Sequence, residues 1–249
     1  MAARPPNSPA AELLRSTQGK YIELRASRHE LAAVTVLTMP EIMSTERVAL
    51  LRHLGADLRL TPGILMHDAV ALARQIAVEE GAVWLNQFDN PANAQVHRDA
   101  TAEEIWRDAG GRVDVFVSAV GTGGTITGVG EVKARNPQLR CVAVEPASAA
   151  VLSGQPAGAH KIPGIGVGFV PPVLNRGIVH EIVMVSDDEA FSAARRLATE
   201  EGILSGASAG AALHAALTIA ERPDMRDKTI VMLMADSAER YVTTDLIAR

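Results

Sequence analysis

The sequence has few of the residues on which several classes of protein depend. It contains one cysteine, Cys141, which excludes a disulfide framework and favours a reducing compartment. Aromatic residues make up 3% of the chain and the net charge is −5, unlike a basic, base-stacking nucleic-acid surface. No apolar run approaches membrane length, and the start of the chain lacks the apolar segment of a secretory signal. These absences predict a cytoplasmic protein that binds neither nucleic acid nor membrane.

Apolar residues, in contrast, make up 47% of the 249 residues, and from Leu31 onward they fall into alternating strand and helix patterns. We expect strands at 31–38, 57–61, 82–85, 113–120, 139–145, 178–185 and 229–235. Expected helices lie at 44–55 (capped by Ser44), 65–80, 102–108, 126–135 and 187–201 (capped by Asp187 or Asp188). Strands separated by helices indicate an α/β fold, a parallel sheet with helices on both faces. Cys141 falls inside a strand pattern, where a buried core residue is expected.

The most informative stretch is residues 113–128, an apolar run followed by the letters GTGGTITG. A buried strand, a loop of glycines and threonines, and a helix start together form a cradle for a phosphate group. A P-loop is excluded, because Gly128 is followed by Val129 and Gly130 instead of Lys and Ser or Thr. A dinucleotide site with Glu145 as ribose partner and a tight turn without ligand stay open as alternatives. A single phosphate, as on a small cofactor, is favoured.

Three other stretches stand beside this one as candidates. The amide-rich residues 86–97 follow an expected strand end, where ligands bind in open α/β sheets. The glycine-rich run HKIPGIGVGF at 160–169 is expected to be a loop near the site. Residues 202–213 place small residues and two serines at a helix start, which indicates either a second anion pocket or close helix packing. The seven histidines show no metal-ligand spacing.

By these residues the chain resembles the cysteine synthase (O-acetylserine sulfhydrylase) family of fold type II pyridoxal-phosphate enzymes, from about Leu37 to the C-terminus. Nine pieces carry the resemblance in one order, and KIPGIG in particular favours this family over cystathionine β-synthase. They are TMPEIMSTER (38–47), GADLRLTP (55–62), NQFDNPAN (86–93), EEIWRD (103–108), VGTGGTITG (120–128), VAVEP (142–146), HKIPGIGVGF (160–169), EEGILSG (200–206) and DSAERYVTT (236–244).

The resemblance implies the fold type II architecture and a site for pyridoxal 5′-phosphate. The cofactor-binding residues it implies are Gly121, Thr122, Gly123, Gly124 and Thr125 at the phosphate and Ser237 at the pyridine nitrogen. The substrate-binding residues it implies are Gln87, Gly164 and Ile165. The implied reaction replaces the acetoxy group of O-acetylserine with sulfide, giving L-cysteine and acetate. The implied assembly is a homodimer, with serine acetyltransferase as a possible partner.

The front of the chain departs from the family. The family carries its Schiff-base lysine well before the TMPE motif, followed by an SGNTG-like loop, and neither is found, so no catalytic residue is assigned. The lysines present, Lys20, Lys133, Lys161 and Lys228, do not match that segment. The domains expected are a poorly structured or non-native start (1–30), a remnant of the smaller α/β domain (31–100) and the larger domain (101–249). A catalytically inactive homologue, or a fragment that binds a phosphate ligand or a partner, stays open as the alternative.

Overall fold

The structure, a computed structural model, describes residues 23–26, 33–64, 66–132 and 136–247. The chain divides into two compact units, Met1–Gln87 and Phe88–Arg249. The division lies earlier in the chain than the residue 100 expected from the sequence. Most of the expected poorly structured start, residues 1–22 and 27–30, lies outside the described residues, as do Lys20 and Lys133.

Unit 1 contains one four-stranded sheet with the strand order β3-β2-β1-β4. Its elements are β1 (Glu23–Ala26), β2 (Ala33–Pro40), α2 (Thr45–His53), β3 (Asp57–Thr61), α3 (Met66–Glu80) and β4 (Val83–Trp84). β2 and β3 are parallel, as expected, but β1 runs antiparallel to both β2 and β4. Only residues 27–32 join β1 to β2, which is too short for the crossover that a parallel pair needs. The sheet of unit 1 is therefore mixed.

Two local expectations for unit 1 need adjustment. The strand expected at 31–38 lies at Ala33–Pro40, and Pro40 pairs with Thr61 of β3. Ser44 does occupy the N-cap position of α2, but its side chain makes no capping hydrogen bond. The small core of this unit is built from Leu37, Met39 and Leu51, which are almost fully buried.

Unit 2 is built on a second four-stranded sheet, with the order β7-β6-β5-β8 and every pair parallel. Its strands are β5 (Val115–Ala119), β6 (Arg140–Pro146), β7 (Val179–Val185) and β8 (Ile230–Met232). Its helices are α4 (Pro91–Val96), the π-helix η1 (His97–Thr101), α5 (Ala102–Asp108), α6 (Gly124–Glu131), α7 (Asp187–Glu201) and α8 (Ala207–Ala220). Short 3₁₀ helices lie at Ala147–Ala149 (η2), Arg176–Ile178 (η3), Pro223–Met225 (η4) and Ala238–Tyr241 (η5). This arrangement confirms the expected α/β class, although residues 91–101 are helical where a loop was expected.

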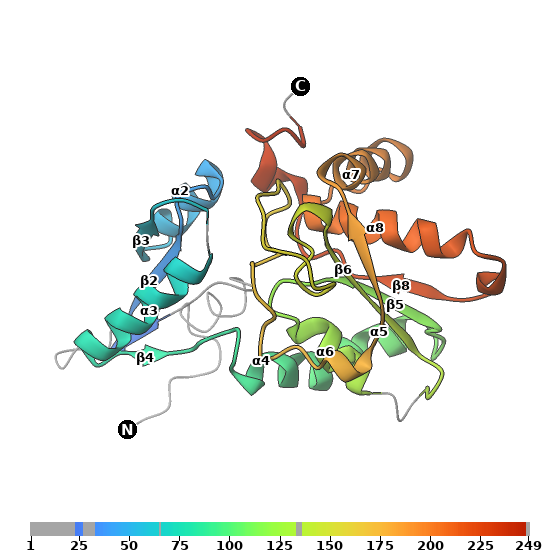
Figure 1. The fold of residues 1–249 in the computed structure, drawn as a ribbon, viewed down its shortest axis with the longest axis horizontal. Helices are drawn as coiled ribbons and strands as arrows, with labels where there is room; N and C mark the ends of the chain where they lie inside the picture. The colour runs from blue at the N-terminus through green and yellow to red at the C-terminus, as the bar shows by residue number, and fades with distance from the viewer. Residues whose placement is uncertain (1–22, 27–32, 65, 133–135, 248–249) are drawn as a thin grey trace. The chain divides into compact units, whose positions relative to one another are not determined.

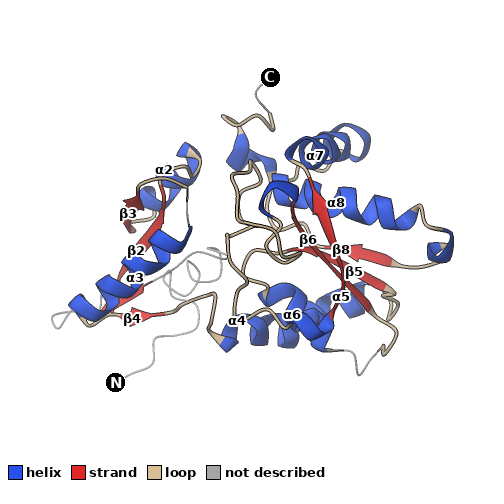
Figure 2. Cartoon of the chain, viewed as in Figure 1, coloured by secondary structure: helices blue, strands red, loops and turns tan. Residues whose placement is uncertain are grey.

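Helices cover both faces of this sheet, as Figures 1 and 2 show. Side chains alternate between the faces of a strand, so neighbouring residues of β5 enter different cores. Val115 and Val117 pack in a cluster with residues of α7 and α8. Phe116, between them, packs with residues of α6 and with Cys141, which is fully buried as expected. The sheet's long apolar runs are explained by burial on both sides.

The start of α7 corrects an expectation about its cap. The N-cap is Ser186, not Asp187 or Asp188. The Ser186 hydroxyl accepts the N–H of Glu189, and the Glu189 carboxylate accepts the N–H of Ser186, which forms a capping box. The two aspartates instead lie in the first turn, where their charge complements the helix dipole.

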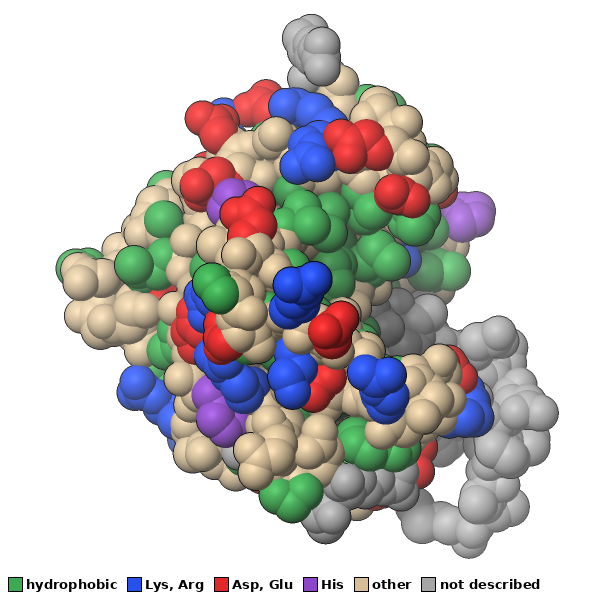
Figure 3. Space-filling view, turned by 90° about the vertical axis from the view of Figure 1, so that its right-hand side faces the viewer, with side chains coloured by type: hydrophobic (Ala, Val, Ile, Leu, Met, Phe, Trp, Pro, Cys, Tyr) green, Lys and Arg blue, Asp and Glu red, His purple; other side chains and the backbone are tan. Residues whose placement is uncertain are grey.

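Ion pairs between arginines and carboxylates lie on the outside of unit 2. Arg222 bonds Glu181 at 2.6 Å, and Arg140 reaches Glu181 at 3.6 Å and Asp224 at 3.3 Å. On the face drawn in Figure 3, basic and acidic side chains are interspersed around an area of hydrophobic side chains. Within the described part of the chain, no helix combines the length and apolar character required to span a bilayer.

Candidate functional site

The loop between β5 and α6 is the centre of the candidate site. The segment expected to bind phosphate, residues 121–125 (the glycine–threonine loop), joins the end of β5 to the first two residues of α6. Gly123 is the N-cap and has φ of +81°, which glycine adopts without strain. Among the described residues, the backbone N–H groups of Thr122 and Gly123 have no acceptor. These donors and the positive end of α6 together suit an anion.

Neighbouring segments pack so closely on this loop that its glycines cannot carry a side chain. A Cβ at Gly121 would collide with the carbonyl oxygen of Gly164, and one at Gly124 with the amide oxygen of Asn93. Asn93 also donates from Nδ2 to Thr122 Oγ1 over 3.0 Å. The Thr122 oxygen further accepts the N–H of Gly124 over 3.2 Å. Asn93 therefore holds the loop from the helix α4, whose cap is formed by the amide loop that the sequence singled out.

His97, at the start of η1, contacts the same loop and was not singled out by the sequence. Its Nε2 lies 3.2 Å from Thr125 Oγ1, and its Nδ1 lies 3.0 Å from Thr101 Oγ1. Burial lowers the pKa of His97, which favours the neutral imidazole. The one available signal was its place at the end of the amide-rich stretch. His97 and Thr125 are too far apart in sequence for any local pattern to join them.

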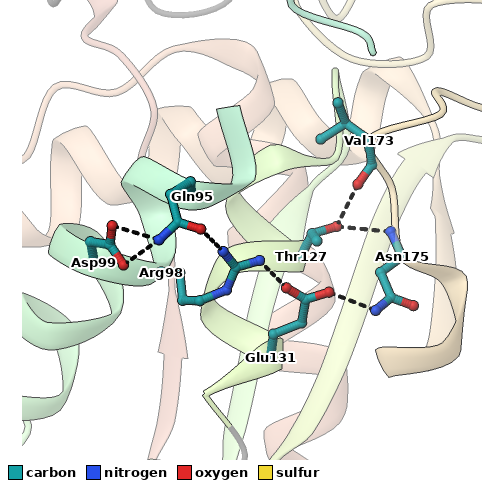
Figure 4. A network of polar contacts seen from close by, with 7 residues as sticks. All are labelled: Gln95, Arg98, Asp99, Thr127, Glu131, Val173 and Asn175. Carbon is teal, nitrogen blue, oxygen red and sulfur yellow. Dashed lines mark hydrogen bonds and ion pairs between the residues drawn. The ribbon is translucent and has the colours of Figure 1, made fainter. Parts of the chain in front are cut away.

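A polar network anchors the rest of α6, as Figure 4 shows. The Thr127 hydroxyl donates to the carbonyl of Val173 over 3.2 Å and accepts the N–H of Asn175 over 2.9 Å. The Asn175 side chain donates to Glu131 over 2.7 Å, and Arg98 of η1 donates to the other Glu131 oxygen. Burial by itself raises the pKa of Glu131, but the bonds from Arg98 and Asn175 outweigh it and leave the pKa lowered. Helix α6 is therefore bonded to η1 through Arg98 and to residues 173–175 through Thr127 and Glu131.

Gly164 and Ile165, the residues predicted to close over the substrate, have different environments. Gly164 has φ of +92° and its carbonyl lies against the glycine–threonine loop. The chain is tied there by the N–H of Gly166, which donates to the carbonyl of Val120 over 3.2 Å. Ile165, in contrast, is 5% exposed and packs in the hydrophobic core with β6 and α8 residues. Its side chain therefore faces the core in this conformation.

Ser237 follows β8, which lies next to β5 in the parallel sheet. The carboxyl ends of parallel neighbours meet at one edge, so Ser237 and the glycine–threonine loop lie at the same edge. The Ser237 hydroxyl donates to the Glu239 carboxylate. Beside it, Tyr241 donates to Asp236 Oδ2 over 2.6 Å, and Asp236 Oδ1 is buried without a partner among the described residues.

The start of α8 lies against the same strand end. The N–H of Gly206 donates to the carbonyl of Asp236 over 3.0 Å. Ser205 is 3% exposed, and its hydroxyl has no partner within the described ranges. Further along, a Cβ at Gly210 would lie 2.8 Å from Ala194 Cβ of α7. The small residues of α8 therefore serve close helix packing, which supports that interpretation over a second anion pocket.

Gln87, the remaining predicted substrate residue, is the last residue of unit 1, and its side chain is half-buried. The next residue, Phe88, is the first of unit 2 and accepts the N–H of Val173 over 3.0 Å. The ring of Phe88 meets that of Phe169 edge to face, with 5.0 Å between the centroids. Phe88, the residue after Gln87, is thus held by contacts within unit 2.

Glu145 cannot be the ribose partner that a dinucleotide site needs. It is 2% exposed at the end of β6. One carboxylate oxygen accepts the N–H of Leu152 over 2.7 Å, and the other accepts that of Ser153 over 2.9 Å. Both oxygens are used to anchor the turn after η2, so the dinucleotide alternative loses its acidic residue.

The two described lysines are both paired with carboxylates. Lys161 pairs with Asp245, and this hydrogen bond raises the pKa of the Lys161 amine. Lys228 lies 3.2 Å from Asp114. Asp114 and Lys228 precede β5 and β8, at the amino ends of the strands, whereas the loop lies at the carboxyl ends. Each amine is paired with a carboxylate, so neither is poised for covalent chemistry.

Comparison with known proteins identifies the family that these features suit. A family profile described as pyridoxal-phosphate dependent enzyme matches residues 24–236. Cysteine synthase of Haemophilus influenzae is 46% identical over 221 residues, covering 84% of this chain and 70% of that protein. Cysteine synthase A of Escherichia coli is 43% identical over 253 residues, covering 96% of this chain and 78% of that protein. The resemblance to cysteine synthases is confirmed.

Solved structures agree with the fold. A cysteine synthase from Entamoeba histolytica superimposes with a TM-score of 0.79 at 40% identity, covering 85% of this chain and 63% of that one. A variant of O-ureido-L-serine synthase bound to O-ureido-L-serine gives 0.80 at 41% identity, with coverages of 85% and 66%. The fold type II architecture is confirmed. The chain spans just under two thirds of these two structures.

Proposed function

The chain belongs to the family of pyridoxal-phosphate-dependent enzymes, and we propose that it acts there as a cysteine synthase. The proposed reaction replaces the acetoxy group of O-acetylserine with sulfide and yields L-cysteine and acetate. The observation that carries the proposal is the glycine–threonine loop, closed in by Gly164 and Asn93 at the start of α6. The 43–46% identity to cysteine synthases supports the choice of substrates.

The described residues fit the cofactor at two places. The free N–H groups of Thr122 and Gly123 and the start of α6 suit a phosphate, and the crowding around Gly121 and Gly124 leaves room for backbone donors only. At the neighbouring strand end, Asp236 Oδ1 and Ser205 Oγ are buried polar atoms without partners in the described part of the chain. A polar ligand would supply what these atoms lack.

The resemblance supplies the roles of the residues. The glycine–threonine loop would bind the phosphate, and Ser237 would offer a neutral hydroxyl to the pyridine nitrogen. When bound, the cofactor supplies an electron sink for negative charge that develops on the substrate. By the same resemblance, Gln87 is expected to contact the substrate, and so is the segment with Gly164 and Ile165. Proton transfer at the substrate's α-carbon needs a base that none of the described lysines supplies, because Lys161 and Lys228 are paired elsewhere.

We test cofactor binding with the purified full chain and two probes, pyridoxal 5′-phosphate and pyridoxal, which lacks the phosphate. We expect tighter binding of the phosphorylated probe and loss of that preference in Gly123→Val, where a β-branched side chain would be forced into φ of +81° against Leu174. Ser237→Ala should weaken pyridoxal phosphate binding by about 0.5–1.5 kcal/mol, the net value of one hydrogen bond. An unchanged affinity in Gly123→Val would remove the phosphate site.

We test the reaction by following sulfide-dependent cysteine formation from O-acetylserine. Because the lysine that supplies acid–base chemistry in the family is not located, we expect turnover well below that of the longer relatives. Borohydride reduction and peptide mapping should show no stoichiometric adduct on any lysine. A single stoichiometric adduct on Lys20 or Lys161, with cysteine formation, would show that expectation to be wrong. Cofactor binding without any cysteine formation would limit the function to ligand binding.

The assembly and location are proposed from the same relationship. We expect a homodimer in the cytoplasm and contact with serine acetyltransferase, as the resemblance to cysteine synthases implies. Light scattering of the purified chain measures the mass directly, since one chain is 26.3 kDa. A monomer at micromolar concentration would contradict the dimer.

A further inference from the structure

His97 joins two threonines that lie on different elements of unit 2. Its Nδ1 is 3.0 Å from the hydroxyl oxygen of Thr101, at the other end of the π-helix η1. Its Nε2 is 3.2 Å from the hydroxyl oxygen of Thr125, in the first turn of α6. π-helical turns are rare and often mark functional sites. The ring therefore couples a threonine outside the glycine–threonine loop to one inside it.

The backbone around His97 leaves the ring little freedom to move away from α6. A Cβ at Gly128 would lie 2.5 Å from the carbonyl oxygen of Ala94, 2.6 Å from His97 Cβ and 2.7 Å from the N atom of Arg98. η1 thus lies directly on the glycine of α6. Arg98 and Glu131 then pair across the same two elements. The distance between His97 and Thr125 is set by backbone packing, so the hydrogen bond is preorganised.

A neutral imidazole has one N–H donor and one acceptor, so the chain of three groups can run in only two directions. In one, Thr101 donates to Nδ1, and Nε2–H donates to Thr125. The Thr125 proton is then free for an external oxygen. In the other direction, the Thr125 hydroxyl donates its hydrogen bond to Nε2 and cannot donate to a phosphate oxygen.

We propose that His97 is a positioning residue that holds the Thr125 hydroxyl as a donor to the phosphate of the ligand, with its proton on Nε2 and Thr101 fixing that tautomer. This inference rests on the proposed phosphate site. Burial lowers the pKa of the imidazole and so favours the neutral ring, and the charged side chains Arg98 and Glu131 on the packed elements pair with one another.

The tautomer can be measured without any ligand. Long-range ¹H–¹⁵N correlation spectra of the ¹⁵N-labelled full chain distinguish an Nδ1–H from an Nε2–H imidazole, and the signal of His97 is assigned by its loss in His97→Gln. We expect the Nε2–H tautomer. The Nδ1–H tautomer would overturn the proposal, because Thr125 would then be the donor to His97. This readout does not depend on whether the chain binds pyridoxal phosphate.

A matched pair of variants tests the effect on binding. The amide nitrogen of Gln reaches roughly the position of histidine Nε2, whereas that of Asn reaches roughly that of Nδ1. We expect His97→Asn to weaken pyridoxal 5′-phosphate binding about tenfold or more, and His97→Gln to keep the affinity within about threefold. Pyridoxal, without the phosphate, should bind all three proteins equally.

Three outcomes separate the possibilities. Equal losses in His97→Asn and His97→Gln, or equal losses for pyridoxal and its phosphate, would show that His97 is only structural and overturn the proposal. The wild-type chain could also show the Nε2–H tautomer but bind pyridoxal and pyridoxal 5′-phosphate with equal affinity. That result would refute the proposed phosphate site and not the direction of the hydrogen bonds. The expected tautomer together with the expected contrast between the variants supports both.

Discussion

The close packing around the glycine–threonine loop can be tested by comparing the free energies of unfolding of two glycine-to-alanine variants, one in the loop and one outside it. Gly123 and Gly154 have nearly the same positive φ, +81° and +82°. A Cβ at Gly123 would lie 2.7 Å from Leu174 Cβ and 3.1 Å from Leu174 Cα, whereas a Cβ at Gly154 would meet nothing within 4 Å. Gly123→Ala and Gly154→Ala therefore share the conformational cost and differ in the space available.

The expected magnitudes follow from these two terms. A left-handed conformation costs a residue with a Cβ about 1–2 kcal/mol, and the loss of unfolded-state entropy offsets part of this equally in both variants. Forcing a methyl group against Leu174, which is 7% exposed and belongs to the core, adds about 1–3 kcal/mol. We expect Gly154→Ala to lower the free energy of unfolding by about 1 kcal/mol and Gly123→Ala by about 2–4 kcal/mol.

Urea unfolding followed by tryptophan fluorescence is a suitable assay. The chain has two tryptophans, Trp84 in unit 1 and Trp106 in unit 2, so both variants are made in a Trp84→Phe background in which only unit 2 reports. The slope of the transition checks that the unfolded state is unchanged. A difference between the variants below about 0.5 kcal/mol would refute the argument that Leu174 confines the loop.

Three further predictions concern groups around the site and the outer face. Glu145→Gln should cost about 1–3 kcal/mol of unfolding free energy in a urea titration, since an amide NH₂ would face one of two backbone N–H donors. Arg222→Met should lose about 1 kcal/mol or less near neutral pH. The hydrogen bond from Arg222 lowers the folded-state pKa of Glu181, so this difference is present above the ordinary glutamate pKa and disappears as the pH falls through the lowered one; a difference that grows in acid would contradict the reasoning. Tyr241→Phe removes the donor to Asp236 and should lower thermal stability and pyridoxal phosphate affinity together, and a loss of stability alone would separate this pair from the site.

The parts of the fold that the sequence predicted are those encoded locally. The apolar run of β5 and the glycines after it specify a buried strand, a turn and a helix start within sixteen residues, 113–128. The cap of α7 is also encoded locally, because Ser186 and Glu189 have the spacing of a capping box. Residue type alone, however, also allows the neighbouring aspartates as caps. β1 could not be predicted in this way. Its four residues, ELRA, have no strand pattern, and pairing with β2 and β4 specifies them.

The candidate site divides in the same manner. Gly123 and Thr125 were predicted from a pattern of neighbours, whereas the groups that position them come from distant sequence. Asn93 is 29 residues from the threonine that it bonds, and His97 is 28 residues from Thr125. Ile165 was carried over from the family as a substrate residue, and a sequence pattern does not show that its side chain turns into the core. Contacts between segments, not local composition, decide these orientations.

The contacts that shape the glycine–threonine loop come from Asn93, His97, Gly164 and Leu174, all of which belong to unit 2. The geometry of the phosphate site therefore does not depend on where unit 1 lies. The lysine of the family, by resemblance, belongs before the TMPE motif at 38–41, where this sequence has no match to the lysine segment. Because the described contacts that shape the loop come from unit 2, its affinity for phosphate is expected to persist whether or not the chain carries a lysine competent for catalysis.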